Sequence, residues 1–561
     1  MYIFAASQDK CNEYFIRKQK HNALKNIKLL IVSLVVFLAI TPPLQAQTVE
    51  DFGSRITVYA IILALVVLLI FIGLPLYAWY KPKSRFRNKT FRYSSPLLPL
   101  VPPSLPSYVK GKKVHILKGG HDIWLTGVPQ GKLLDRTVKT YALQPTEFRG
   151  MFPIPKVLVQ VGDRVKAGQI VYHDREKTEI NYAAPVSGEV LAINRGAKRS
   201  IVEIVIAADN TIEYLPLNPP SPESCSREEL VEFLLSCGAW PLFNQRPYDI
   251  IPDKDTVPRD IFISTFNTAP LSCDNNIAVN GNGPAFQQGL DVLTKLTSGQ
   301  VHLGLNANAK DAPADEFLNS KNVEKHWFHG KHPAGNVGVQ IHHVRPLGLR
   351  DVVWTLTVQQ VIQLGKIFTE KKWVADRVVA VGGSSVHETG YVRTKTGANI
   401  GELFGEVDNG ARLISGDVLS GSQKLKRNFL NWRDEMATAI PEGTYNEFFG
   451  WFIPSVAAPS ASRTYANYFF PKKQFDGDTN KHGEKRAFVM TDDYDNMLPM
   501  DIHLLHLMKS VVVNDYDGME GLGLKELSEE DVALAEWRCT SKQPLQQIVR
   551  KGLDMLREQE M

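Results

Sequence analysis

The strongest constraint on this chain is an uninterrupted apolar run, residues 58–80, that contains no charged side chain. At 1.5 Å per residue, its 23 residues form a helix long enough to cross a hydrocarbon core of about 30 Å. Tyr77, Trp79 and Tyr80 close the run, and aromatic rings favour the membrane interface. The sequence therefore predicts a transmembrane helix over residues 57–80.

The charges after this run predict its orientation. Residues 81–92 hold six basic side chains and no acidic one. Because positive charge resists translocation, the C-terminal side of the helix is expected to be cytoplasmic. Residues 81–110 form a basic, proline-rich linker whose prolines favour extended backbone. We therefore expect a single-pass protein of the inner membrane with its soluble body on the cytoplasmic side.

An earlier apolar run, 29–40, follows a basic stretch and precedes Leu44-Gln45-Ala46. This arrangement is typical of a secretory signal, although Leu44 stands where a small residue is usual. Residues 1–46 are a candidate signal peptide, and both its cleavage and its retention stay open.

Charge and cysteine usage exclude several classes of function. Residues 1–92 carry 13 basic and 4 acidic side chains, whereas the other 469 residues carry 51 basic and 55 acidic ones. A mildly acidic body argues against a nucleic-acid partner, which needs clustered positive charge. The five cysteines form no C-x-x-C pair. We therefore expect neither an iron–sulfur cluster nor a structural zinc site held by cysteines.

Two stretches of alternating apolar and polar residues, 156–171 and 184–193, each carry a glycine turn. They predict paired short strands. Two such halves resemble the biotinyl/lipoyl barrel-sandwich hybrid, which we place at residues 111–215. In carriers of that fold, a lysine at the hairpin tip holds the prosthetic group.

Lys177 stands at the position of that lysine, seven residues before Ala184. Its neighbours are Glu176 and Thr178, where a biotin carrier has methionine on both sides. We interpret Lys177 as an ordinary hairpin lysine in a fold used without its prosthetic arm.

Residues 255–385 alternate between short apolar strands and amphipathic helices, which favours a Rossmann-like α/β domain. The expected strands are 260–266, 300–305 and 377–383, and the expected helices are 286–296 and 357–368. The glycines at 281–283 lack the third glycine of a dinucleotide loop, since Phe286 occupies its place. Residues 382–385 follow a strand, but no helix follows them to hold a phosphate. Dinucleotide binding is therefore not expected.

The C-terminal part divides into two further units. Residues 386–450 predict a small β-grasp-like, SLBB-like unit, and residues 451–561 predict a mainly helical domain. Ser528 is the expected N-cap of one of these helices, with Asp531 three residues later in a weakened capping box.

Histidines concentrate between His326 and His343. His329 and His332 are the candidate quinone contacts, because an imidazole N–H can donate a hydrogen bond to a quinone carbonyl. Loop packing, or contact with another subunit, is the alternative for both residues. Metal binding requires carboxylate or cysteine companions at fixed spacing, and none is evident, so no metal site is expected.

Eight short motifs occur in order between residues 112 and 556: 118–127, 161–163, 182–188, 193–196, 332–335, 392–394, 414–421 and 497–502. Together they resemble the A-subunit family of the Na+-translocating NADH:quinone oxidoreductase. The resemblance implies a translocase complex of six subunits that passes electrons from NADH through flavins and iron–sulfur centres to quinone and exports Na+.

The resemblance also implies a cytoplasmic-face subunit without a cofactor or redox centre of its own, beside subunits B to F and the membrane. This chain departs from the family in its first 110 residues, which supply the predicted anchor. We name no catalytic residue. The hypothesis is a structural subunit that shapes the quinone pocket of an enzyme complex.

The alternative hypothesis is a membrane-anchored barrel-sandwich adaptor or carrier protein. Export adaptors insert a long coiled-coil hairpin in the barrel-sandwich domain. Only about 15 residues separate Gln169 from Pro185, which leaves no room for such a hairpin.

Overall fold

The computed structural model describes residues 105–152, 154–446 and 472–560, together with 459, 461 and 470. The candidate signal peptide 1–46, the predicted span 57–80 and the linker up to residue 104 lie outside the described residues. Among the helices that are described, none is long and apolar enough to cross a membrane.

The first part of the body is a sandwich of two small antiparallel sheets, as the alternating pattern predicts. One sheet has the order β2-β8-β7-β4 and the other β3-β5-β6. Tyr172 and Tyr182 stack between them with ring centroids 4.4 Å apart. The strands are β2 (Thr140–Leu143), β3 (Lys156–Val157), β4 (Arg164–Val165), β5 (Ile170–His173), β6 (Asn181–Ala183), β7 (Gly188–Arg195) and β8 (Ile201–Ala208).

Lys177 lies in the hairpin between β5 and β6 and forms an ion pair with Asp253. Its side chain is 29% exposed. A lysine that carries a swinging prosthetic arm has to be free of such a partner, so this contact favours the interpretation of Lys177 as an ordinary hairpin residue.

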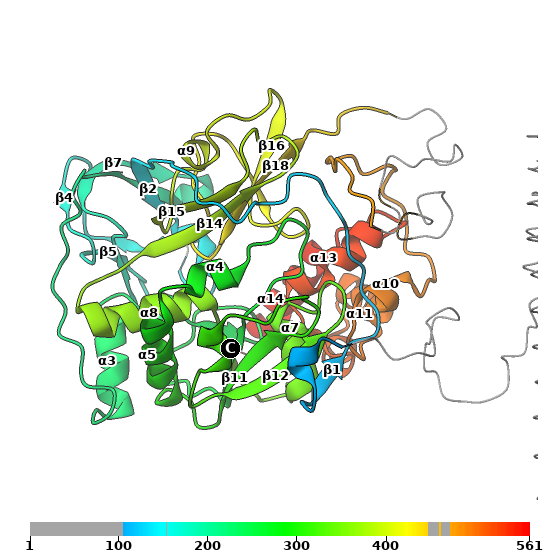
Figure 1. Cartoon of the computed structure of the whole chain (residues 1–561), viewed down its shortest axis with the longest axis horizontal. Helices are drawn as coiled ribbons and strands as arrows, with labels where there is room; N and C mark the ends of the chain where they lie inside the picture. Colours follow the sequence, from blue (N-terminus) through cyan, green and yellow to red (C-terminus); the bar gives the residue numbers. More distant parts are fainter. Residues whose placement is uncertain are drawn as a thin grey trace, which may run out of the picture. The chain divides into compact units, whose positions relative to one another are not determined.

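The second part is a six-stranded sheet of order β1-β12-β11-β10-β13-β9, in which only β9 runs antiparallel to its neighbour. Helices connect its strands and cover it (Figure 1). The strands are β1 (Val114–Ile116), β9 (Asn244–Arg246), β10 (Asp260–Ser264), β11 (Val301–Asn306), β12 (Glu324–His329) and β13 (Val353–Thr357). The helices are α3 (Arg227–Ser236), α4 (Asn275–Val279), α5 (Gly283–Thr294), α6 (Asp315–Leu318), α7 (Val337–Val344) and α8 (Val358–Glu370).

Local sequence explains why α8 begins where it does. The Thr357 hydroxyl accepts the backbone N–H of Gln360 at 3.3 Å, and the Gln360 side chain accepts the backbone N–H of Thr357 at 2.8 Å. This capping box satisfies two donors that a helix start leaves free. The expected helices 286–296 and 357–368 are confirmed as α5 and α8. The glycines at 281–283 follow α4 rather than a strand.

A third sheet has the order β15-β14-β18-β16-β17 and carries the short helix α9 (Ile400–Phe404). The strand that we expected at 377–383 within the α/β domain lies in this sheet as β14, where it pairs with β15 and β18. An apolar strand after a helix fits either sheet, and only the pairing distinguishes them. The strands are β14 (Asp376–Gly382), β15 (Gly390–Lys395), β16 (Ala411–Ser415), β17 (Ser422–Lys424) and β18 (Met436–Pro441).

The C-terminal residues form a helical bundle with a separate apolar core around Leu507, Met508 and Leu553. The expected cap at Ser528 is confirmed, because the Asp531 carboxylate accepts the Ser528 backbone N–H at 2.9 Å. The bundle lies against the β12 and α7 side of the large sheet (Figure 1), and its core includes Phe328 of β12. The helices are α10 (Asp493–Met497), α11 (Leu504–Val513), α12 (Tyr516–Gly521), α13 (Glu529–Arg538) and α14 (Leu545–Glu560).

Candidate functional site

A cavity of about 600 Å³ lies where the α/β sheet, the third sheet and the helical bundle meet. Ser264 and Thr357 line it at the carboxyl ends of β10 and β13, and Asn336 lines it at the start of α7. Parallel strands with helical connections leave a crevice at this edge of the sheet, where ligands of such folds usually bind. The topology therefore explains the location of the cavity.

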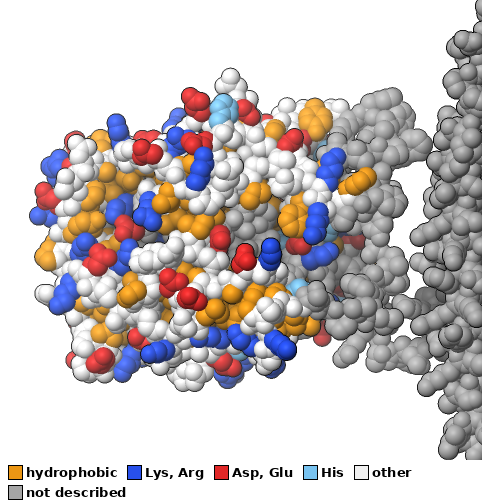
Figure 2. Space-filling model, viewed as in Figure 1, with side chains coloured by type: hydrophobic (Ala, Val, Ile, Leu, Met, Phe, Trp, Pro, Cys, Tyr) orange, Lys and Arg blue, Asp and Glu red, His pale blue; other side chains and the backbone are white. Residues whose placement is uncertain are grey.

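Charged side chains from separate segments converge on this cavity. Three arginines line it, Arg149, Arg246 and Arg433. A larger number of carboxyl groups face them, namely Glu147, Asp249, Asp417, Asp434, Glu435, Glu529 and Glu530. The surface drawn in Figure 2 differs, because basic and acidic side chains are interspersed over that face. The cavity therefore gathers more acidic than basic groups in one place.

Burial changes the protonation of several of these carboxyl groups. It raises the pKa of Asp434 to about 7, and it raises the pKa of Glu147 and of Glu435. Burial opposes the ionisation of Asp249 too, but the nearby Arg246 and Arg149 more than offset this and lower its pKa. Carboxyl groups with pKa values moved in opposite directions inside one cavity are a signature of functional sites.

Asp434 predicts a pH dependence of stability. Its native pKa of about 7 exceeds the ordinary 3.8, so its contribution to stability is complete below about pH 4 and is lost as the pH rises through 7. Three units correspond to about 4 kcal/mol. Because Asp434 is only partly buried, solvent screening reduces this to roughly 2 kcal/mol. We expect Asp434→Asn to be more stable than the parent at pH 8 by that amount and equal to it at pH 4. Urea unfolding at several pH values measures this, and parallel pH profiles for both proteins would contradict it.

Neither of the two candidate quinone contacts is among the residues that line this cavity. His329 is half-buried at the end of β12, with its Nδ1 3.0 Å from the carbonyl oxygen of Ala307. His332 is buried, and Gly335, three residues later, lines the cavity. Their contact with quinone stays a prediction.

The tautomer of His332 follows from its surroundings. Burial lowers the pKa of His332, although the nearby Asp417 and Asp122 oppose this, so the ring is neutral at pH 7. The Thr268 hydroxyl accepts the backbone N–H of Gly335 at 3.0 Å and is 3.1 Å from His332 Nδ1. The hydroxyl can donate its own proton to Nδ1, and in that tautomer the ring proton of His332 is on Nε2.

That Nε2–H has no hydrogen-bond partner among the described residues. Leaving a buried donor without a hydrogen-bond partner costs roughly 1–3 kcal/mol of stability. Binding of a molecule that accepts a hydrogen bond from this N–H is therefore favoured.

Sequence reasoning did not identify the arginines and carboxyl groups of the cavity. They come from the segment before β3, from β9 and the turn after it, from the β16–β17 and β17–β18 connections, and from the start of α13. No motif joins segments so far apart in the sequence, and only their packing brings them together.

The chain is similar to known proteins over most of its length. Three family models match the chain: the NqrA N-terminal barrel-sandwich hybrid domain at residues 114–209, the NqrA second alpha/beta domain at 225–373 and the NQRA C-terminal domain at 378–425. The NqrA protein of the Na(+)-translocating NADH-quinone reductase from Yersinia pestis bv. Antiqua is 35% identical over 79% of this chain and 99% of its own length. The chain belongs to the NqrA family.

Other NqrA proteins match to a similar extent. The corresponding protein from Neisseria meningitidis serogroup A is 35% identical, and that from Mannheimia succiniciproducens is 36% identical, each over 79% of this chain and 99% of its own length. A solved NAD+-reducing [NiFe]-hydrogenase is 10% identical over 33% of this chain and 40% of its own, with a TM-score of 0.25, which is too low to support an argument.

The match confirms the resemblance drawn from the eight motifs, together with the barrel-sandwich and SLBB-like domains. As an NqrA protein, the chain is a subunit of a translocase complex. The first of the three family matches begins at residue 114. It therefore begins after the N-terminal residues in which the sequence departs from the family.

Proposed function

We propose that this NqrA chain shapes the quinone pocket of a Na+-exporting NADH:quinone oxidoreductase and holds no redox centre of its own. In this proposal, subunits B to F carry flavins and iron–sulfur centres that bring electrons from NADH. The predicted helix at 57–80 anchors the chain in the inner membrane, and the body docks on the cytoplasmic face of the membrane subunits.

The observation that carries the proposal is the buried Nε2 of His332, which has no hydrogen-bond partner among the described residues. His332 contacts Thr268, whose neighbour Asn267 lines the cavity. A quinone carbonyl oxygen is an acceptor without a proton, so it matches such a donor. The Thr268 contact fixes the orientation of the ring before any ligand arrives. A donor oriented in advance does not have to be ordered when the ligand binds.

The carboxyl groups of the cavity support the same proposal. Reduction of a quinone to quinol takes up two electrons and two protons. Asp434, with a pKa of about 7, can hold or release a proton close to neutral pH, and burial also raises the pKa of Glu435. Carboxyl groups that exchange protons near neutral pH are suited to a pocket in which a quinone is bound and reduced by electrons from neighbouring subunits.

The test replaces His332 in the assembled complex. In His332→Phe the N–H donor is lost while a ring of similar shape remains. We expect the KM for quinone to rise about tenfold, since a hydrogen bond is worth roughly 0.5–1.5 kcal/mol. NADH oxidation by an artificial acceptor that bypasses the quinone pocket should stay unchanged.

His332→Gln keeps an N–H donor and should recover part of the affinity. His329→Phe tests the second candidate in the same assay. An unchanged KM for quinone in both phenylalanine variants would contradict the assignment of either histidine to quinone contact.

A further inference from the structure

A second cluster of polar side chains lies on the large sheet, apart from the residues that line the cavity. His302 comes from β11, and Glu324 and His326 come from the neighbouring strand β12. His302 pairs with Glu324 in the parallel register. Residues 324 and 326 are two apart on one strand, so all three side chains lie on the same face of the sheet. The spacing along the sequence does not indicate this set, because a neighbouring strand supplies His302.

The three side chains bring their ligand atoms within 4.8 Å of one another. Nδ1 of His302 is 2.9 Å from Nε2 of His326. The Glu324 carboxylate oxygens are 3.5 Å from His302 Nδ1 and 3.8 Å from His326 Nε2. Two ligands of a tetrahedral zinc ion at about 2.0–2.1 Å stand roughly 3.4 Å apart. The observed separations lie on both sides of this value, so small movements of the side chains complete the coordination.

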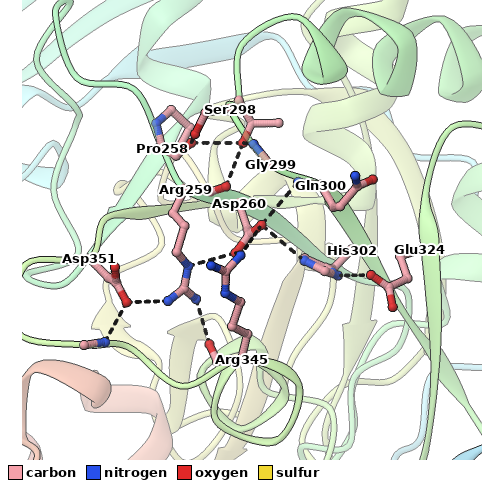
Figure 3. A network of polar contacts seen from close by, with 12 residues as sticks. Pro258, Arg259, Asp260, Ser298, Gly299, Gln300, His302, Glu324, Arg345 and Asp351 are labelled. Atoms are coloured by element: carbon pink, nitrogen blue, oxygen red, sulfur yellow. Dashed lines mark hydrogen bonds and ion pairs between the residues drawn. The ribbon is translucent and has the colours of Figure 1, made fainter.

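A buried carboxylate, that of Asp260, lies behind the His302 ring. Asp260 Oδ1 is 3.5 Å from His302 Nε2, and Asp260 is itself held by Arg259 at 2.8 Å and Arg345 at 3.0 Å (Figure 3). This 3.5 Å contact is longer than a good hydrogen bond, but a carboxylate beside the ring favours the His302 tautomer that carries its proton on Nε2. The lone pair on Nδ1 is then directed toward His326 and Glu324. A carboxylate behind a ligating imidazole is a recurrent feature of zinc sites.

A simple hydrogen bond between the two imidazoles does not account for Glu324. Its carboxylate faces both rings at distances longer than the 2.7–3.2 Å of a good N–H···O bond. The Glu324 side chain is 57% exposed, so water reaches the cluster from that side.

We propose that His302 Nδ1, His326 Nε2 and a Glu324 carboxylate oxygen bind a divalent transition-metal ion of the zinc type. Two imidazoles and one carboxylate leave the fourth tetrahedral position to water. The ion joins β11 to β12 near the sheet edge, where β1 adds His115 with its ring 5.9 Å from that of His326. This site is independent of the quinone proposal.

The test uses the full-length chain in detergent, stripped of metal with a chelator. Zinc sulfate is titrated in competition with a chromophoric chelator, and cobalt(II) reports geometry through its visible absorption. We expect His326→Gln to lose one equivalent of tightly bound zinc and the absorption of tetrahedral cobalt. We expect Glu324→Gln to weaken that equivalent at least tenfold. His503→Gln, which changes an exposed histidine in the helical bundle, is the matched control and should bind as the parent does.

Glu324→Gln keeps the inference testable if His326→Gln does not fold, because residue 324 is exposed at the start of its strand. Equal zinc stoichiometry and affinity in the parent, Glu324→Gln and His503→Gln would overturn the inference. So would a cobalt spectrum without the tetrahedral absorption.

Discussion

Arg246→Met is expected to lower the free energy of unfolding by about 3–5 kcal/mol. The Arg246 side chain is 5% exposed and lies 3.0 Å from Glu530 Oε1 and 3.6 Å from Asp531 Oδ2. The Asp531 side chain is fully buried. Methionine keeps the apolar stem but removes the charge, which leaves Asp531 without its cationic partner in a site that water does not reach. Urea unfolding of the purified chain measures the loss.

Arg149→Met is the matched control for this change. Arg149 is 41% exposed and pairs with Asp249 and Glu529, each at 2.7 Å. Exposed ion pairs contribute roughly 0–1 kcal/mol, so this variant should lose no more than that. Equal losses of unfolding free energy in the two variants would show that burial of the arginine does not determine the size of the loss. Because Arg246 joins β9 to α13, the larger loss should appear in the transition that unfolds the helical bundle.

Gly365→Ala is expected to destabilise the α/β domain by about 2–3 kcal/mol. A Cβ at Gly365 on α8 would stand 1.7 Å from the carbonyl oxygen of Ala285 on α5. The facing glycine, Gly289, has the Val361 carbonyl oxygen 2.2 Å from its own Cβ position. Alanine gains about 1 kcal/mol of helix propensity, but the contact is with backbone, which moves only if the two helices separate. Thermal unfolding followed by circular dichroism measures the change.

Gly521→Ala provides the control in a helix without such a contact. No atom lies within 4 Å of its Cβ position on α12. Helix propensity alone then acts, so this variant should be unchanged or more stable by up to about 1 kcal/mol. A destabilised Gly521→Ala, or a stabilised Gly365→Ala, would contradict the close approach of α5 and α8.

Local sequence patterns predict the helices and strands that depend on interactions between residues close together in the sequence. Helices begin at Thr357 and Ser528 because side chains of the first turn satisfy free backbone donors. The Thr357 hydroxyl accepts the N–H of Gln360, and the Asp531 carboxylate accepts the N–H of Ser528. The alternating stretches around Gly162 and Gly188 form the barrel-sandwich strands for the same kind of reason. The sequence predicts a strand at 377–383, which the structure has at 376–382, but not the sheet to which it belongs, because its pairing partners are not specified by the local pattern.

The candidate sites show the same division. The sequence indicates His332 as a quinone contact, but its free donor depends on Thr268, 64 residues earlier. The zinc-type cluster combines His302 with Glu324 and His326 across two strands, and Asp260 from a third strand supports it. Spacing within one segment does not reveal such a set.

The sequence by itself determined the family, the order of its domains and the local helices and strands, because motifs, caps and periodicity act over a few residues. The tertiary structure alone decided which charges meet in the cavity, which imidazole nitrogen is left without a partner and which three side chains surround a space for a metal ion. Burial and strand pairing set these features, and both depend on contacts between residues that are far apart along the chain.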